Sequence, residues 1–238
     1  MYKYLLWRLA PFYIIAIISE FISFGVLLLV EHDVVDWSFM AMMKTIGILF
    51  KTTTIAFLYI MLPYITYLCV LPTKYINSKF DKNFSVLIFA SFVFYTFFEE
   101  TMSLVFWNKF SASFNTDAVN YVLDINMISN SLSHNYLFFG YILALVAITN
   151  LVVLKSKKFL WHKPPLFGLS KRILYWIIYV ASCILIFVNS NDDDLKISEN
   201  QTNNELSKDG TYSLGKSVWS IKTDLYKFYI IKKYNNSK

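Results

Sequence analysis

The sequence predicts an all-α membrane protein: a bundle of five transmembrane helices with its N-terminus inside, its C-terminus outside and amphipathic helices at the outer surface. Hydrophobic residues make up 56% of the 238 residues and aromatic residues 19%, and the mean hydropathy of +0.47 lies above the soluble range. The apolar residues form runs of about twenty, the helix length that crosses a hydrocarbon layer ~30 Å thick. Lysine and arginine gather on one side of these runs, which sets the orientation because short cytoplasmic loops retain basic residues.

The first apolar run, about 9–30, is a retained span and not a signal peptide. It is too long for a signal peptide and ends at Glu31 and Asp33 without a small-residue cleavage site. The other four runs cover about 52–71, 84–107, 137–154 and 172–188. We therefore divide the chain into a five-helix membrane domain, 1–188, and extracytoplasmic juxtamembrane helices, 189–238.

The loops alternate in charge along the chain. One set carries only Asp81 as an acid and is otherwise basic, with Lys3, Arg8, Lys74, Lys79, Lys82, Lys155, Lys157, Lys158, Lys163, Lys171 and Arg172. The opposite set carries Glu31, Asp33, Asp36, Asp117, Asp124 and Asp192 to Asp194. Because the basic residues lie in loops between apolar runs, the net charge of +6 is an orientation signal and does not indicate a nucleic-acid partner.

Two lysines precede the second span on one helical face. Residues 37–50 predict an outer-interface helix that leads into this span, and Lys44 and Lys51 are seven positions apart. Two interpretations stay open: lysines that extend toward the lipid headgroups, or a pair of cations that holds a lipid phosphate at the outer surface.

Ionisable residues inside the apolar runs are costly and need partners or a polar cavity. Glu20 lies in the middle of the first run, where we expect a partner inside the bundle or a direct functional role. Glu99 and Glu100 interrupt the third run, and we expect them to mark where this span leaves the outer leaflet. Cys69 and Cys183 both lie in apolar runs, where a thiol acts as a small apolar residue, so no disulfide is expected.

The polar segment after the fifth span leads into a predicted amphipathic helix. Gly210 is interpreted as a helix stop. The apolar stripe beyond it recurs at steps of three and four residues and is expected to dock on an apolar surface or in the outer headgroup layer. The stripe consists of Leu214, Val218, Ile221, Leu225 and Phe228.

The sequence contains no motif for soluble-type catalysis. Its three histidines are isolated from one another, and no zinc-protease, Cys-x-x-Cys, P-loop or dinucleotide pattern is present. Five spans without a repeat also differ from the usual pattern of transporters.

The outer loop and the tail resemble the membrane region of the lipoteichoic acid synthase–like family, the sulfatase-superfamily phosphoglycerol and phosphoethanolamine transferases. The matching positions are Gly47 to Lys51, Phe114-Asn115, Asn120-Tyr121-Val122, Asn130, Ser133 to Tyr136, Asp209-Gly210 and Thr223 to Tyr229. The chain departs from the family pattern at Ser113, Asn120, Lys51 and Leu137, where the family has arginine, aspartate, an acid and proline.

The resemblance implies a multi-pass module of the bacterial cytoplasmic membrane that anchors, and presents lipid to, a sulfatase-like transferase. Its lipid-binding candidates are Lys44, Lys51, Asn115, Asn120 and Tyr121. In the family the catalytic domain follows this region and holds the metal ion (manganese, magnesium or zinc), so we expect no cofactor and no catalysis here, and a catalytic domain in trans as partner beside membrane lipids. The alternatives are a non-catalytic membrane interaction protein and a small transporter subunit.

Overall fold

The computed structural model describes residues 2–110, 136–161, 168–189 and 198–216, and its regular elements over these residues are helices. The long helices are α1 (Tyr2–Val30), α2 (Phe39–Val70), α3 (Lys79–Phe110), α6 (Tyr136–Leu160) and α7 (Leu169–Asn189). A short 3-10 helix, η1 (Thr73–Tyr75), joins α2 to α3, and α8 (Gln201–Leu206) follows α7. A further helix begins at Gly210 and is described as far as Lys216.

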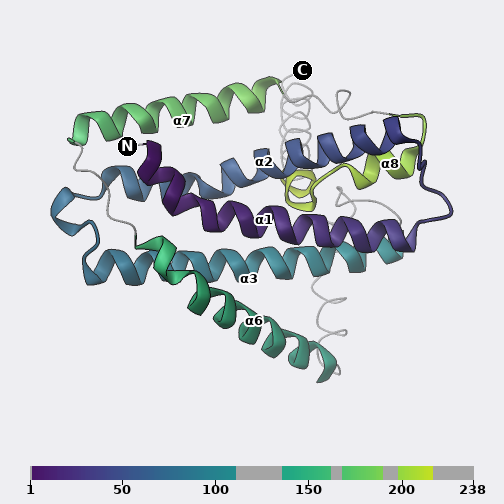
Figure 1. Ribbon diagram of the computed structural model, residues 1–238, viewed down its shortest axis with the longest axis horizontal. Coiled ribbons are helices and arrows are strands. Elements are labelled where there is room, and N and C mark those ends of the chain that lie inside the picture. The colour runs from purple at the N-terminus through teal and green to yellow at the C-terminus, as the bar shows by residue number, and fades with distance from the viewer. Residues whose placement is uncertain (1, 111–135, 162–167, 190–197, 217–238) are drawn as a thin grey trace, which may run out of the picture.

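The three helices α1, α2 and α3 form the centre of the bundle, and the two later long helices flank it (Figure 1). Helix α7 packs along α2, whereas α6 packs against α3 and α1. Successive long helices run in opposite directions, so the α2–α3 and α6–α7 connections lie at the same end of the bundle as the N-terminus. This is the end to which the basic residues belong, and the acidic α1–α2 loop lies at the other end.

Four helices are long and apolar enough to cross a membrane: Leu5–Val30, Phe39–Val70, Lys79–Asn108 and Leu169–Ile186. The protein is therefore a helical membrane protein. Helix α6 covers the run predicted as the fourth span. Its crossing of the membrane, the total of five spans and the inside position of the N-terminus stay predictions.

The outer surface of the bundle is apolar, as lipid contact requires. On α1, Ile14, Ile18 and Ile22 recur every fourth residue and are each more than half exposed. On α7, Ile173 and Ile177 follow the same spacing on an exposed face. Helical positions four apart share a face, so these side chains form continuous apolar strips directed away from the protein.

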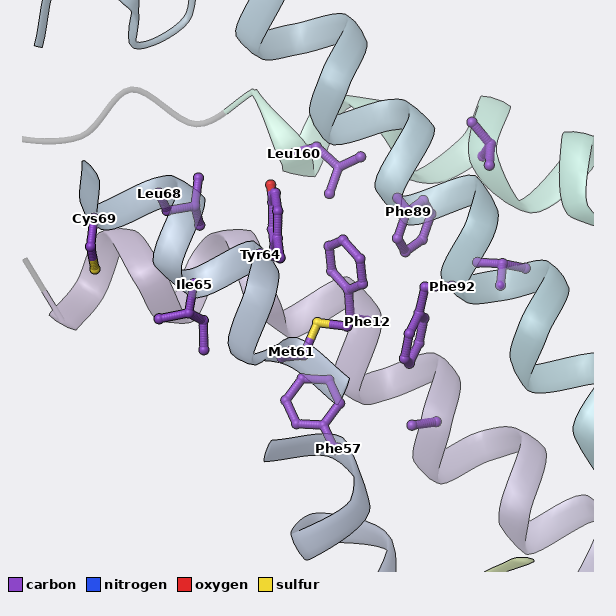
Figure 2. Close-up of a cluster of buried hydrophobic side chains, with 13 residues drawn as sticks. Phe12, Phe57, Met61, Tyr64, Ile65, Leu68, Cys69, Phe89, Phe92 and Leu160 are labelled. Atoms are coloured by element: carbon purple, nitrogen blue, oxygen red, sulfur yellow. The ribbon is translucent and has the colours of Figure 1, made fainter. Parts of the chain in front are cut away.

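Aromatic side chains fill the middle of the bundle (Figure 2). Phe12 of α1 is fully buried, and its ring centroid lies 4.8 Å from Phe89, 5.2 Å from Tyr64 and 5.3 Å from Phe92. Phe57 extends the group, with its centroid 6.3 Å from that of Phe92. These separations fit the favourable edge-on and tilted contacts of aromatic rings. We call Phe12, Phe57, Tyr64, Phe89 and Phe92 the aromatic layer.

A buried ion pair lies on the N-terminal side of the aromatic layer. Arg8 and Asp81 are both fully buried, and the two guanidinium nitrogens donate to the two carboxylate oxygens at 3.0 and 2.7 Å. Arg8 also donates to Ser85 Oγ at 2.9 Å, and Asp81 accepts from the Tyr67 hydroxyl at 3.1 Å. The assignment of Arg8 to a basic loop was thus wrong: its charge lies inside the bundle, where Asp81 neutralises it.

Polar contacts also fasten α7 to α2. Arg172 donates to the Leu71 carbonyl and, at 3.2 Å, to Thr73 Oγ1. Trp176 Nε1 donates to Thr66 Oγ1 at 2.8 Å, and the Tyr179 hydroxyl donates to the Leu58 carbonyl at 2.6 Å. Cys69 and Cys183 are free and buried on these two helices.

Candidate functional site

Four carboxyl groups from three segments meet inside the bundle. Glu20 comes from α1, Glu99 and Glu100 from α3, and Asp209 from the residues just after α8. Each is less than a tenth exposed. We call these four residues the acidic cluster and residues 198–216 the tail segment.

The members of the cluster contact one another and nearby hydroxyl groups. The Glu20 carboxyl lies within hydrogen-bonding reach of both Glu100 and Asp209. Ser19 and Ser23, which flank Glu20 on α1, reach the Glu100 carboxyl. The sequence-based expectation that Glu20 has a partner inside the bundle is thus confirmed, and its partners are other acids.

The expectation that Glu99 and Glu100 mark where the third span leaves the outer leaflet stays a prediction. Both are buried, and α3 continues to Phe110. Adjacent helical residues point about 100° apart, and each of the two is covered by a different neighbour. Glu100 faces the serines of α1, whereas Glu99 reaches Thr211 of the tail segment.

The tail segment is fastened to α2 by Asn203, which is fully buried. Its Oδ1 accepts from the Asp36 backbone N–H at 2.8 Å, and its Nδ2 donates to the Asp36 carbonyl at 3.1 Å and to Thr45 Oγ1 at 3.3 Å. Helix α8 therefore lies beside the Phe39 end of α2 (Figure 1). Because this buried side chain forms hydrogen bonds with two backbone groups and one hydroxyl, it fixes the position of the tail segment along α2.

Asp209 brings the fourth carboxyl into the cluster and starts a helix. Its backbone N–H donates to Thr52 Oγ1 at 3.1 Å, and its Oδ1 accepts from the Tyr212 N–H at 2.7 Å, as an N-cap residue does. Burial raises the pKa of the Asp209 carboxyl above its usual range, against the opposing effect of the Tyr212 N–H. The interpretation of Gly210 as a helix stop is wrong, because Gly210 is the first helical residue after this cap.

Two small cavities border the cluster, and Glu100 lines both. The first is lined by Glu99, Asp209 and Thr211 among others, and leaves about 20 Å³ for the centre of a water molecule, which is enough for one ordered water. One carboxylate oxygen of Glu99, Oε1, is buried there without a hydrogen-bond partner. The second cavity leaves about 10 Å³ and is lined by Glu20, Glu205 and Lys208 among others.

The charged groups near the cluster leave it without a cation of its own among the described residues. Lys208 borders the second cavity, but its Nζ lies 2.6 Å from Glu205 Oε1. Helix α2 contributes the hydroxyl of Thr53, which reaches Asp209. In the described part of the chain, no three histidine, cysteine, aspartate or glutamate side chains are arranged to hold a metal ion. The expectation that any metal belongs to a separate domain stays a prediction.

The aromatic layer separates the acidic cluster from the Arg8–Asp81 pair. Phe57 and Phe92 line the first cavity and close it on that side. Phe12 packs between the two polar groups of the bundle, against Phe89 and Phe92. Apolar aromatic side chains therefore bound the polar cluster on the side that faces the Arg8–Asp81 pair.

The two lipid-binding candidates that the structure describes lie apart from the acidic cluster, on α2. Lys44 and Lys51 are exposed on one face of α2, so the prediction that they share a face is confirmed. The helix predicted for residues 37–50 is continuous with α2, which starts at Phe39. Asn115, Asn120 and Tyr121 lie outside the described residues.

One residue of the predicted docking stripe is described. Leu214 packs against Phe106 of α3, so this part of the tail docks on the chain's own bundle. The remaining stripe residues, Val218, Ile221, Leu225 and Phe228, lie outside the described residues.

No family model, curated protein or solved structure matches the chain. The class of protein therefore rests on the fold and the site: a helical membrane protein with a buried acidic cluster under a docked tail segment. The resemblance to the sulfatase-superfamily transferases stays a prediction from the sequence motifs.

Proposed function

We propose that this protein is a membrane-anchoring module that binds anionic lipid headgroups at the outer surface of the bacterial cytoplasmic membrane. On this proposal it presents lipid to a sulfatase-like phosphoglycerol or phosphoethanolamine transferase domain and performs no catalysis alone. The observation that carries the proposal is the arrangement of α2, whose two exposed lysines lie on the turns that also seat the tail segment.

The two faces of α2 differ sharply at this end. Thr45 and Thr52, each one position after a lysine, are fully buried and contact the tail segment. Lys44 and Lys51 are exposed and seven residues apart, which separates them by about 10 Å along the helix axis. An exposed ammonium group near the end of a membrane helix binds lipid phosphate through charge and hydrogen bonds.

The apolar side chains around the lysines support a headgroup site. Phe39, Met40, Met43 and Phe50 are among the exposed large hydrophobic residues of α2. Acyl chains that contact these side chains would place their phosphate groups close to the ammonium groups. The motif resemblance in the tail supports the second part of the proposal, the transferase partner.

The lipid part is tested with the purified chain and its Lys44→Gln/Lys51→Gln variant. Native mass spectrometry compares retention of phosphatidylglycerol with that of phosphatidylcholine. We expect the wild-type chain to prefer phosphatidylglycerol and the variant to lose this preference. The matched control, Lys74→Gln/Lys79→Gln, removes two exposed lysines from the opposite end and should keep the preference. Equal retention by wild type and the Lys44/Lys51 variant would refute the lipid site.

The partner is tested by adding a purified sulfatase-like transferase domain to the chain in lipid nanodiscs. Stable co-purification supports an anchor that acts in trans. Failure of the pair to associate would count against the transferase partner and leave the lipid site as a separate result.

A second candidate function is that of a small transporter subunit, and the acidic cluster is the observation that favours it. Ionisable groups inside membrane helices commonly mark ion or proton pathways. Substrate uptake into proteoliposomes that disappears in Glu20→Gln would support this function over the anchor.

A further inference from the structure

We propose that the acidic cluster is a proton-binding site: it holds shared protons while the tail segment is docked, and these protons keep Asp209 in place. The proposal concerns residues other than the lipid-binding lysines and does not depend on the function proposed above.

The contacts within the cluster require protons. An ionised carboxylate only accepts hydrogen bonds, so two carboxyl groups form a hydrogen bond only when one of them carries a proton. Glu20 reaches both Glu100 and Asp209. Each such contact between two of these carboxyl groups needs a shared proton. Without protons the same contacts would place like charges together in a medium of low dielectric, which is strongly unfavourable.

Among the described residues, the groups that surround the cluster supply no unpaired cation to balance its charge. Helix α1 contributes Glu20, and α3 contributes Glu99, Glu100 and the phenol of Tyr95, which pairs with Thr211 at 3.1 Å. The tail segment contributes Asp209 together with Glu205 and Lys208, and these last two pair with each other. Helix α2 contributes hydroxyl groups only. The described residues therefore supply four acids and no unpaired cation, and on this proposal protons supply the counter-charge.

The orphan oxygen of Glu99 gives the site a place where protons enter and leave. Oε1 of Glu99 is buried without a hydrogen-bond partner and borders the cavity that has room for one water. A buried acceptor beside such a cavity is the usual position of an ordered water. A water at this point would connect Glu99 with Glu100 and Asp209, which line the same cavity.

Proton occupancy is linked to docking because Asp209 belongs to the tail segment. When residues 207–216 leave the bundle, Asp209 returns to water and its carboxyl ionises at the usual pH. The docked state thus binds more protons than the released state, so docking weakens as pH rises. Helix α8 is held separately by Asn203, which does not titrate, so we expect release of residues 207–216 while α8 stays in place.

The protons are tested by infrared spectroscopy of the full chain in nanodiscs. We expect the carbonyl absorption of protonated carboxyl groups to be present near neutral pH. Glu20→Gln/Asp209→Asn removes the two acids that join the segments and should lose roughly half of this absorption or more. Asp33→Asn, whose side chain is 86% exposed, is the matched control and should leave it unchanged. Absence of protonated carboxyl absorption in the wild type would overturn the proposal.

Docking is tested by pulsed electron resonance distances between spin labels. Gly47 of α2 and Gly215 of the tail segment both have free space for a side chain, so Gly47→Cys/Gly215→Cys carries the labels, with Cys69 and Cys183 replaced by alanine. The distance should lengthen and broaden from about pH 5 to about pH 9, and Glu20→Gln/Asp209→Asn should abolish this change. The control pair, Gly25→Cys/Gly47→Cys, joins α1 to α2 and should stay constant. A Gly47–Gly215 distance that is also constant with pH would overturn the proposal.

Discussion

Replacement of Asp81 by asparagine should strongly destabilise the protein, because it leaves the Arg8 guanidinium buried without its counter-charge. Arg8 and Asp81 are both fully buried and share two short hydrogen bonds. The amide of asparagine offers one acceptor oxygen where the carboxylate offers two. It also lacks the negative charge that attracts the guanidinium.

The magnitude follows from the number of groups that lose a partner. Asp81 accepts from Arg8, from the Tyr67 hydroxyl at 3.1 Å and from the Asn77 backbone N–H at 2.7 Å. Removal of one member of a buried ion pair costs about 3–5 kcal/mol. We expect Asp81→Asn to lower the free energy of unfolding by this amount. The double variant Arg8→Met/Asp81→Leu replaces both charges by apolar groups and should cost less than the single variant.

The assay is reversible unfolding of the purified chain by a denaturing detergent, followed by circular dichroism. Asp33→Asn, an exposed change, should stay within about 0.5 kcal/mol of wild type. If Asp81→Asn costs less than about 1 kcal/mol, the buried pair does not contribute as argued. Arg8→Met and Asp81→Leu are also measured singly. If their costs simply add in the double variant, the two charges are not coupled, which would also refute the reasoning.

Three other predictions use the same unfolding assay. Asn203→Ala removes three hydrogen bonds and should cost about 1–3 kcal/mol, with the loss of protection confined to the tail segment in hydrogen exchange. Trp176→Phe keeps an aromatic side chain but loses the bond to Thr66 and should cost about 1 kcal/mol or more. Burial raises the pKa of Asp209 in the folded protein above its value of ~3.9 in the unfolded chain. The contribution of Asp209 to the free energy of unfolding is therefore full below the unfolded pKa and is lost as pH rises through the folded pKa. Asp209→Asn should make the fall of stability with pH shallower.

The helices were predictable from the sequence because apolar runs report lipid contact directly. All five predicted runs lie within the long helices, apart from Leu71 at the end of the second run. The helix ends were less predictable, because a charged residue beside an apolar run has the same local pattern whether it lies in a loop or inside a helix. Arg8 can lie inside the bundle on α1 because Asp81 of α3, more than seventy residues away, neutralises its charge. No local pattern contains that pairing.

The acidic cluster shows the same limit more strongly. Glu20 could be selected from the sequence, since a carboxyl group in the middle of a span is unusual. Its three partners could not be assigned, because Glu99 and Glu100 lie at the border of an apolar run and Asp209 lies in a polar segment. The Asp209-Gly210 pair suits either the end or the start of a helix. The tertiary contacts with Thr52 and Thr53 determine that it starts one.

The two buried polar groups of the bundle obey one physical rule in different ways. Arg8 and Glu20 are twelve residues apart on α1, which separates them by about 18 Å along the axis, so one bilayer thickness spans both. Within that thickness each polar group must find its partners inside the protein. Arg8 and Asp81 do so as a pair of opposite charges. The acidic cluster has no unpaired cation among the described residues, and on our proposal shared protons take the part that the guanidinium takes at the other end.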